Sequence, residues 1–244
     1  MDHPHHRDGA VVLHSGGQDS TTCLAWAISH WGRENIFPLS FNYGQRHIIE
    51  LEAAAKTAER LTVRPRRVLP VPALNILGAA ALTNSKISVN ANAKGTGNVY
   101  AEEHDLPSTF IPGRNMLFFT LGIAYAAKLG IHNLVTGVCE TDRAGYPDCR
   151  AEFVSAAQNA LRLALDDDFL NIYAPLVHRS KAETFLLAEE LGVLDTILEL
   201  THTCYYGDRS NRFDWGYGCG ECPACHERSH GWTEYDENLA VPYE

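Results

Sequence analysis

Short apolar runs alternate with longer segments of helical spacing in the first part of the chain. The run GAVVLHS (9–15) precedes STTCLAWAISHWG (20–32), whose apolar residues recur at helical spacing before a glycine. The same pair recurs as NIFPLSFNYG (35–44) and QRHIIELEAAAKTAERL (45–61), and RRVLPVPAL (66–74) follows as a third apolar run. The pattern predicts three strands separated by two helices.

The alternation resumes after a polar gap. Residues 115–130, 151–165 and 180–192 have helical spacing, and apolar runs at 132–140 and 171–177 separate them. Strands that alternate with helices form parallel sheets with right-handed crossovers. We therefore predict an α/β protein with a five-stranded parallel sheet and helices on both faces.

Two parts of the chain lack this periodicity. Residues 75–112 are rich in Asn, Gly, Ser and Thr, and so long a connection in a compact domain is typically functional or disordered. The periodicity ends again near Thr201, where a cysteine-rich segment begins. We therefore predict a main domain over residues 10–200 and a small C-terminal module over residues 201–244.

The charge balance narrows the choice of partners. The chain of 244 residues has 20 Lys and Arg against 30 Asp and Glu, which gives a formal net charge of -10. This balance argues against a broad contact with a phosphate backbone, so we expect no direct nucleic-acid binding. The opening residues 1–9 are polar, and no apolar run approaches the roughly 20 residues of a membrane-spanning helix. A cytoplasmic protein without membrane contact is predicted.

The first predicted strand ends in glycines and hydroxyl residues that pack poorly in a core. The turn SGGQDS (15–20) exposes backbone N–H groups at a helix N-terminus, where negative charge is favoured. It matches neither GxxxxGK[ST] nor GxGxxG. A plain turn with Asp19 or Ser20 as helix cap is the alternative, and we favour phosphate binding. The hydroxyls of Ser15, Ser20, Thr21 and Thr22 can add donors to phosphate oxygens. The residues predicted to bind a phosphate-bearing cofactor are His14, Ser15, Gly16, Gly17, Gln18, Asp19, Ser20, Thr21, Thr22, Cys23 and Leu24.

Four of the seven cysteines gather near the C-terminus, as Cys204, Cys219, Cys222 and Cys225. Four thiolates suit a tetrahedral metal site, and a site closed by four protein ligands is structural rather than catalytic. Thiolates in a reducing compartment favour zinc, although compact CxxCxxC runs also suit iron–sulfur clusters. His202 or His226 is an alternative to Cys204 as the fourth ligand.

The glycine turn and three further motifs together resemble the motifs of a known family. SGGxDS resembles the pyrophosphate loop of the ATP pyrophosphatases. FNYGQRH (41–47), GRNMLF (113–118) and GVCETDRAGYPDCRAEF (137–153) follow in order. Together these motifs resemble the 7-cyano-7-deazaguanine synthase family over residues 11–225.

The resemblance implies a fold and an assembly. The fold is Rossmann-like, of the adenine nucleotide alpha hydrolase type, with a nucleotide-binding catalytic domain followed by a zinc-binding module. The family uses zinc at the cysteines, although residues 205–218 form a longer spacer than is usual there. A homodimer is also implied.

The resemblance also implies a reaction that consumes ATP with Mg²⁺. 7-Carboxy-7-deazaguanine, ammonia and ATP give the nitrile preQ0, a precursor of queuosine. The carboxylate is adenylated, ammonia displaces AMP to form an amide, and adenylation of the amide oxygen precedes elimination to the nitrile. AMP and pyrophosphate are the expected products, with ADP and phosphate as the competing outcome. A glutaminase domain would not fit in this chain, so free ammonia is expected.

The motifs assign candidate site residues at the ends of predicted strands. Asp19 is expected to orient the phosphate loop or to help hold the metal, Arg114 to pair with phosphate or carboxylate, and Lys181 to reach a phosphate. The predicted substrate-binding residues are Tyr43, Gln45, Arg46, Arg114, Asn115, Asp142, Tyr146, Asp148 and Arg150. Asp148 as a helix cap and Lys181 as a surface residue are the alternatives. For Cys149 we favour a packing or turn role.

Three rival functions share parts of this pattern. An ammonia-dependent NAD synthetase would have the same loop, but GYPDCR and the terminal cysteines argue against it. A tRNA-thiolating enzyme predicts a basic face and a catalytic cysteine pair, whereas Cys139 and Cys149 do not form a CxxC pair. A non-catalytic nucleotide-binding protein would bind ATP without turnover.

Overall fold

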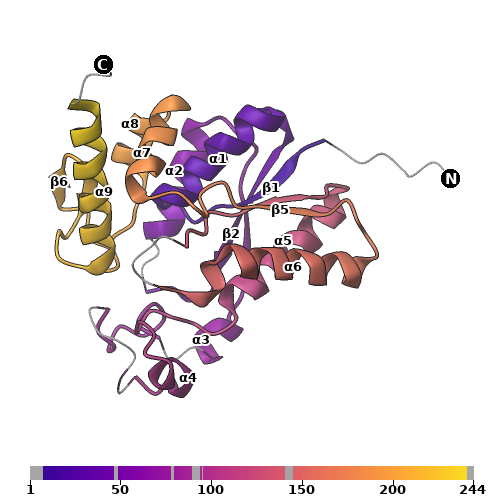
Figure 1. Ribbon diagram of the computed structural model, residues 1–244, viewed down its shortest axis with the longest axis horizontal. Coiled ribbons are helices and arrows are strands. Elements are labelled where there is room, and N and C mark those ends of the chain that lie inside the picture. Colours follow the sequence, from indigo (N-terminus) through magenta and orange to yellow (C-terminus); the bar gives the residue numbers. More distant parts are fainter. Residues whose placement is uncertain are drawn as a thin grey trace.

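The protein folds around one parallel sheet (Figure 1). The computed structural model describes residues 8–46, 49–77, 80–89, 94, 96–140 and 145–240. The strands are β1 (Ala10–Leu13), β2 (Ile36–Asn42), β3 (Arg67–Pro70), β4 (Asn133–Val135) and β5 (Asn171–Tyr173). Their order is β3-β2-β1-β4-β5 and every neighbouring pair is parallel, so the predicted five-stranded parallel sheet is confirmed.

Helices cover both faces of this sheet, as predicted. The longer helices are α1 (Gln18–Trp31), α2 (Ile49–Arg60), α5 (Arg114–Leu129), α6 (Ala151–Leu165), α7 (Lys181–Glu190), α8 (Leu194–Leu200) and α9 (Pro223–Ala240). Helices α1, α2, α7 and α8 lie on one side of the sheet, and α5 and α6 lie on the other (Figure 1). Among the described helices, none combines the length and the apolar character needed to cross a bilayer.

Two buried clusters, one on each side of the sheet, form the core. Leu24 of α1 and Phe185 of α7 belong to one cluster, and Phe119 of α5 and Leu161 of α6 belong to the other. Strand β1 is apolar throughout because it lies in the middle of the sheet with both faces covered.

Glycines end two of the predicted helices at the expected positions. Gly32 follows α1 with φ 77°, and Gly130 follows α5 with φ 70°. Both φ values lie in the left-handed region, which glycine adopts without the steric cost that other residues incur.

The long connection between β3 and α5 contains two short helices, α3 (Ala73–Leu77) and α4 (Val99–Glu103). Ala101 and Phe110 form a small apolar cluster with Leu106 and Tyr146. The hydroxyls of Thr109 and Tyr146 are hydrogen-bonded. The connection is therefore attached to the segment that follows β4.

The C-terminal segment contains structure that the sequence pattern did not predict. A hairpin of β6 (Asn211–Phe213) and β7 (Gly216–Gly218) precedes α9. Helix α9 packs against α7, where a Cβ at Gly231 would lie 2.5 Å from Cβ of Lys181. Cys204 and Cys222 belong to the same buried cluster as α1 and α7. The division of the chain near residue 201 stays a prediction.

Candidate active site and metal centre

A cleft of about 320 Å³ opens at the carboxyl ends of the central strands. The helix after β1 covers one face of the sheet and the helix after β4 covers the other, so the two loops diverge and leave a crevice between them. The loop after β1, the first turns of α2, α5 and α7, and residues 136–139 line the cleft. Residues of the C-terminal segment line it from the side of α9.

The loop after β1 leads into α1 without a side-chain cap. Gly17 is the N-cap residue in extended backbone, and no side chain caps the helix there. The Ser20 hydroxyl lies 3.1 Å from that of Ser15 and accepts from the Ser15 N–H at 3.2 Å. The hydroxyls thus hold the loop in shape, while the helix N-terminus faces the cleft. Backbone N–H groups so placed are suited to bind an anion.

Two buried polar side chains lie beside this loop. Gln18 is 3% exposed and lines the cleft, yet neither atom of its amide has a hydrogen-bond partner among the described residues. Burial, with a smaller effect of Arg66, lowers the pKa of His14 to about 3. A neutral His14 hydrogen-bonds Thr21 and Thr57. Buried polar atoms normally find partners, so the Gln18 amide fits a site that binds a polar ligand.

Close backbone contacts on two sides fix the loop. Gly16 has φ 87°, and a Cβ there would lie 2.3 Å from the Ala54 nitrogen and 2.6 Å from the Glu50 carbonyl oxygen of α2. On the other side, a Cβ at Gly137 would lie 3.0 Å from the Ser20 nitrogen. The loop is therefore held between α2 and the segment after β4, and glycine is needed at Gly16 for both its φ value and this approach.

Asp19 and Lys181 join the first turns of α1 and α7. Lys181 Nζ donates to both carboxylate oxygens of Asp19, at 3.2 Å to Oδ1 and 2.9 Å to Oδ2. Both side chains line the cleft, and Lys181 is only 12% exposed. Lys181 is thus not a solvated surface residue, and Asp19 binds Lys181 rather than capping α1. The pair places one positive and one negative charge beside the loop.

Arg114 is the first residue of α5 and lines the same cleft. It hydrogen-bonds the Tyr43 hydroxyl. Burial lowers the pKa of Arg114, but Tyr43, Tyr146 and Asp148 outweigh it, so the net pKa is raised and the guanidinium stays charged. Burial and Glu50 raise the pKa of Tyr43, although Arg114 lowers it. A fixed guanidinium of this kind is suited to a carboxylate or a phosphate.

Glu50 lies in the first turn of α2 and lines the same cleft. Burial raises its pKa to about 7, and Arg114 offsets part of that effect. Sequence reasoning did not find Glu50. The available signal was its position just after FNYGQRH, in a helix that begins at the carboxyl end of β2.

Aromatic side chains form one wall of the cleft. Phe41 and Phe118 are stacked, with ring centroids 4.2 Å apart and planes 8° apart. The Tyr43 ring centroid lies 5.7 Å from that of Phe118. All three rings line the cleft. Such a wall is suited to the flat ring of a nucleobase.

The structure brings many of the predicted residues together around the cleft. The predicted residues that line it are His14, Ser15, Gly17, Gln18, Asp19, Ser20, Tyr43, Gln45, Arg114, Asn115, Tyr146 and Lys181. Cys149 lines it too and accepts a hydrogen bond from the Asn115 amide at 3.5 Å.

Other predicted residues are not among those that line the cleft. They are Gly16, Thr21, Thr22, Cys23, Leu24, Arg46, Asp148 and Arg150. The Cys23 thiol donates to the Thr136 carbonyl, and Leu24 is fully buried in the core. Asp148 is not the cap of α6, whose N-cap residue is Arg150. Instead it accepts a hydrogen bond from the Asn115 N–H at 3.3 Å. Asp142 lies outside the described residues, and ligand contact by any of these residues stays a prediction.

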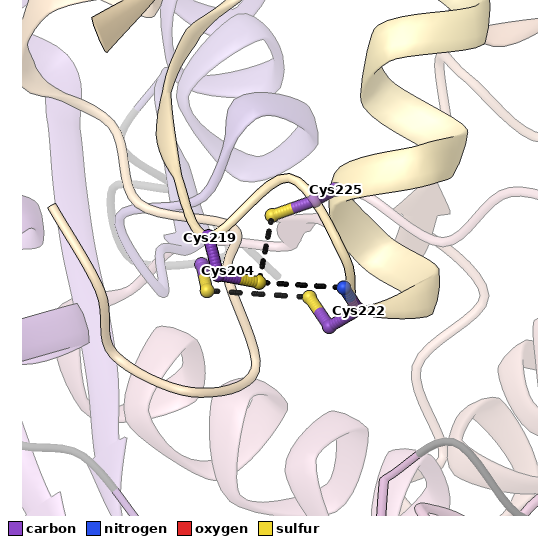
Figure 2. A group of neighbouring side chains, drawn as sticks. All are labelled: Cys204, Cys219, Cys222 and Cys225. Carbon is purple, nitrogen blue, oxygen red and sulfur yellow. Dashed lines mark hydrogen bonds between the residues drawn. The ribbon is translucent and has the colours of Figure 1, made fainter. Parts of the chain in front are cut away.

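The four C-terminal cysteines form a compact cluster (Figure 2). Their sulfur atoms all lie within 4.8 Å of one another. Cys219 and Cys225 are 3.8 Å apart, and the Cys222 N–H donates to Cys219 Sγ at 3.3 Å. Hydrogen bonds from the Cys222 and Cys225 thiols lower the pKa of Cys204. This donor set could hold a metal ion.

The alternative fourth ligands do not join this cluster. His202 is buried, and its Nε2 lies 2.9 Å from the Cys204 carbonyl oxygen. His226 is exposed on α9. Cys204 is therefore the fourth member of the group that the structure brings together.

Arg228, on α9 just after the last of these cysteines, also reaches the cleft. It is 1% exposed and donates to the Trp215 and Ile197 carbonyls and to the Thr201 and Thr203 hydroxyls. Burial lowers its pKa to about 10, while Asp19 acts in the opposite direction. Sequence reasoning missed Arg228 because the helix that carries it was not predicted.

Comparison with known proteins identifies the family. A family model described as "Queuosine biosynthesis protein QueC" matches residues 9–236. The chain belongs to the QueC family. This QueC-family protein is 47% identical over 230 residues to a 7-cyano-7-deazaguanine synthase of Wolinella succinogenes, with 94% of each chain covered.

A second curated relative agrees with this assignment. A 7-cyano-7-deazaguanine synthase of Hyphomonas neptunium is 46% identical over 248 residues, covering 95% of this chain and 96% of the relative. An NH3-dependent NAD synthetase of Campylobacter jejuni, solved with a nitrate ion, is 16% identical with a TM-score of 0.46 and covers 80% of this chain and 68% of its own. The family resemblance seen in the motifs is confirmed. The QueC-family protein is an enzyme of the ligase class that acts in queuosine biosynthesis.

Proposed function

We propose that the protein converts 7-carboxy-7-deazaguanine and ammonia into 7-cyano-7-deazaguanine, with two molecules of ATP cleaved to AMP and pyrophosphate. The observation that carries the proposal is the uncapped N-terminus of α1. It faces a cleft that also holds Lys181 and Arg114. Family membership supports the deazaguanine product, because the relatives are named for it.

In the first activation, the substrate carboxylate attacks the α-phosphorus of ATP and pyrophosphate leaves. The N–H groups of the loop and the Lys181 ammonium lie where charge on the leaving group would need stabilisation. Arg114 also lines the cleft and can hold the carboxylate or the α-phosphate. The stacked rings of Phe41 and Phe118 provide a flat apolar surface for a base.

Ammonia then displaces AMP from the acyl adenylate, which leaves an amide. A second ATP adenylates the amide oxygen, and loss of AMP with that oxygen gives the nitrile. One site can serve both activations, because each transfers an adenylyl group to an oxygen on the same carbon. Since the phosphate loop has the same task in both rounds, no second nucleotide site is required.

Two metals belong to this proposal. Mg²⁺ bound with ATP would neutralise charge on the phosphates, and Asp19 is the cleft carboxylate that belongs to the loop itself. Zinc would be held by Cys204, Cys219, Cys222 and Cys225, whose four sulfurs match the preferred donor set and number for a structural site. A homodimer in the cytoplasm completes the proposal.

Mass spectrometry of the reaction products tests the proposed function. Purified protein is incubated with ATP, Mg²⁺, an ammonium salt and 7-carboxy-7-deazaguanine. We expect the nitrile and AMP in a ratio of one to two, and no AMP when the carboxylate is omitted. Formation of ADP and phosphate in place of AMP would show that the loop does not stabilise a departing pyrophosphate.

Matched variants test whether the reaction takes place in the cleft. Arg114→Gln removes a guanidinium from the cleft, and we expect roughly a 100-fold loss of nitrile formation, as for other fixed charge-stabilising groups. Arg60→Gln is the control, because Arg60 is exposed in the last turn of α2. Equal activities in the two variants would remove Arg114 from the mechanism.

Elemental analysis tests the metal proposal separately. We expect one zinc per chain in the purified protein, and its loss together with a lower Tm in Cys222→Ser. Iron in place of zinc, or full stability of that variant without metal, would reject a structural zinc site.

A further inference from the structure

The nitrogen of the proposed nitrile imposes a requirement on the cleft. Ammonia arrives with three N–H bonds, and the nitrile nitrogen has none. One proton leaves when ammonia displaces AMP, and two more leave while the amide is converted into the nitrile. Each of these protons needs an acceptor close to the reacting carbon.

Three carboxylates line the cleft within the part of the chain that the structure describes: Asp19, Glu50 and Glu227. Asp19 accepts two hydrogen bonds from Lys181, so it is engaged beside the phosphate loop. Glu227 lies on α9, where its charge acts on Tyr205. Glu50 lies close to the phosphate loop through its backbone and interacts with Arg114 through its side chain. It is therefore near both groups to which the proposed function assigns the reacting carboxyl group and its phosphate.

The position of Glu50 follows from contacts on both sides. Its backbone packs directly against the loop, because its carbonyl oxygen would lie 2.6 Å from a Cβ at Gly16. Its side chain is partly buried and interacts electrostatically with Arg114 and Tyr43. Helix α2 therefore fixes the carboxyl group between the groups proposed to bind phosphate and those proposed to bind the carboxylate.

The protonation of Glu50 suits transfer of protons near neutral pH. Burial raises its pKa to about 7, while Arg114 opposes the shift. The other groups that face this region are Tyr43, after β2, and Tyr146 and Asp148, which surround Arg114. A base with a pKa near the working pH both accepts a proton readily and gives it up again, so one group could serve the successive steps.

We propose that Glu50 is the general base that removes the protons from the attacking nitrogen. This inference rests on the function proposed above. As the C–N bond forms and the C–O bond to AMP breaks, the Glu50 carboxylate takes one N–H proton and later releases it to solvent. In the second round, the same carboxylate takes one N–H proton from the adenylated amide and releases it to solvent. It then takes the second N–H proton as the C–O bond to AMP breaks and the C≡N bond forms.

Glu50→Gln tests the proposal, because it keeps the shape of the side chain and removes its basicity. Glu52→Gln is the matched control, since Glu52 lies in the same turn of α2 but is exposed. Two rates are measured for each protein. One is the exchange of labelled pyrophosphate into ATP with the carboxylate substrate and no ammonia, and the other is nitrile formation with ammonia.

We expect Glu50→Gln to retain pyrophosphate exchange within about threefold and to lose nitrile formation by about 100-fold or more. The Glu52→Gln variant should match the wild type in both rates. Equal loss of both rates in Glu50→Gln would assign Glu50 to substrate binding and overturn the proposal. Unchanged nitrile formation would overturn it as well. Absence of both activities in the wild-type protein would instead refute the proposed function.

The pH profile provides an independent readout. A base acts only when it is deprotonated, so the wild-type kcat/KM for free ammonia should rise with pH, reach half of its maximum near pH 7 and level off at higher pH. This dependence should disappear in Glu50→Gln, whose remaining rate should be flat across that range. The same rise in both proteins would show that another group titrates and would reject Glu50 as the base.

Discussion

Helices α1 and α7 both begin at the cleft, and the Asp19–Lys181 pair joins them, but their first turns are completed differently. In α7 the Ser180 hydroxyl accepts from the Glu183 N–H at 3.2 Å, and the Glu183 carboxylate accepts from the Ser180 N–H at 2.6 Å. In α1 the N-cap is Gly17, and no side chain caps the helix. The capped helix α7 holds the Lys181 side chain in place, whereas the uncapped helix α1 keeps its own backbone N–H groups available to an anion.

The largest effect is expected when the uncapped turn loses its glycine. Gly16→Ala places a Cβ 2.3 Å from the Ala54 nitrogen at a φ of 87°, so both α2 and the loop must move. We expect a loss of about 3 kcal/mol or more in the free energy of unfolding, with loss of ATP turnover, measured by urea unfolding and product assay. Gly192→Ala is the control. It has a similar φ of 69° but nothing within 4 Å, and it should cost only about 1 kcal/mol.

Removing the link between the two helices should affect chemistry more than folding. Lys181→Met deletes the ammonium beside the loop, and we expect kcat for pyrophosphate exchange to fall by about 100-fold. Lys56→Met, an exposed change on α2, should leave the rate unchanged. An unaltered kcat in Lys181→Met would mean that Lys181 only positions Asp19.

Pyrophosphate should stabilise the protein by binding at the uncapped turn. At about 100 times its Kd, a ligand of the folded state adds about 2.7 kcal/mol, which corresponds to a rise in Tm of about 5–10 °C for a chain of this size. Ser20→Ala, which removes two hydrogen bonds to Ser15, should reduce the rise. An equal reduction in Ser180→Ala would contradict the distinction between the two helices.

The smallest effect is expected at the capped helix. Ser180→Ala removes the capping box of α7 and should lower the free energy of unfolding by about 1 kcal/mol, with little change in the affinity for pyrophosphate. Ser29→Ala, an exposed position late in α1, should change the stability much less. Thermal unfolding and calorimetric titration of the two variants measure both quantities. A tenfold loss of pyrophosphate affinity in Ser180→Ala would show that the cap also shapes the binding site.

The parts of the fold that apolar periodicity specifies could be predicted. The five strands and the longer helices α1, α2, α5, α6 and α7 were found, because burial on a sheet imposes a period on the sequence. The short helices α3 and α4 were not found, although Leu74 and Ala101 in them are buried. Helix α9 was not found, since PACHERSHGWTEYDENLA is largely polar and contains Gly231 in its interior. That helix depends on packing against α7 and on its proximity to the cysteine cluster, which no local pattern reveals.

The candidate site was predictable where its residues follow one another in the chain. The loop at residues 15–20 and the four cysteines are local motifs with their own chemistry. Glu50 and Arg228 reach the cleft only because α2 packs against Gly16 and α9 packs against α7. Their roles depend on contacts between distant segments, so the sequence alone did not distinguish them from solvated helix residues.

The close approach of Gly231 to Lys181 restricts the substitutions that this chain can accept during evolution. Any side chain at position 231 would have to displace the start of α7, because its Cβ would lie 2.5 Å from that of Lys181. A substitution there would be tolerated only with a compensating shift elsewhere, most directly in α7 or α9. Few substitutions should therefore be tolerated at Gly231, although it belongs neither to the cleft lining nor to the cysteine cluster. For the same reason, grafting the C-terminal segment onto another scaffold would require transferring α7 with it.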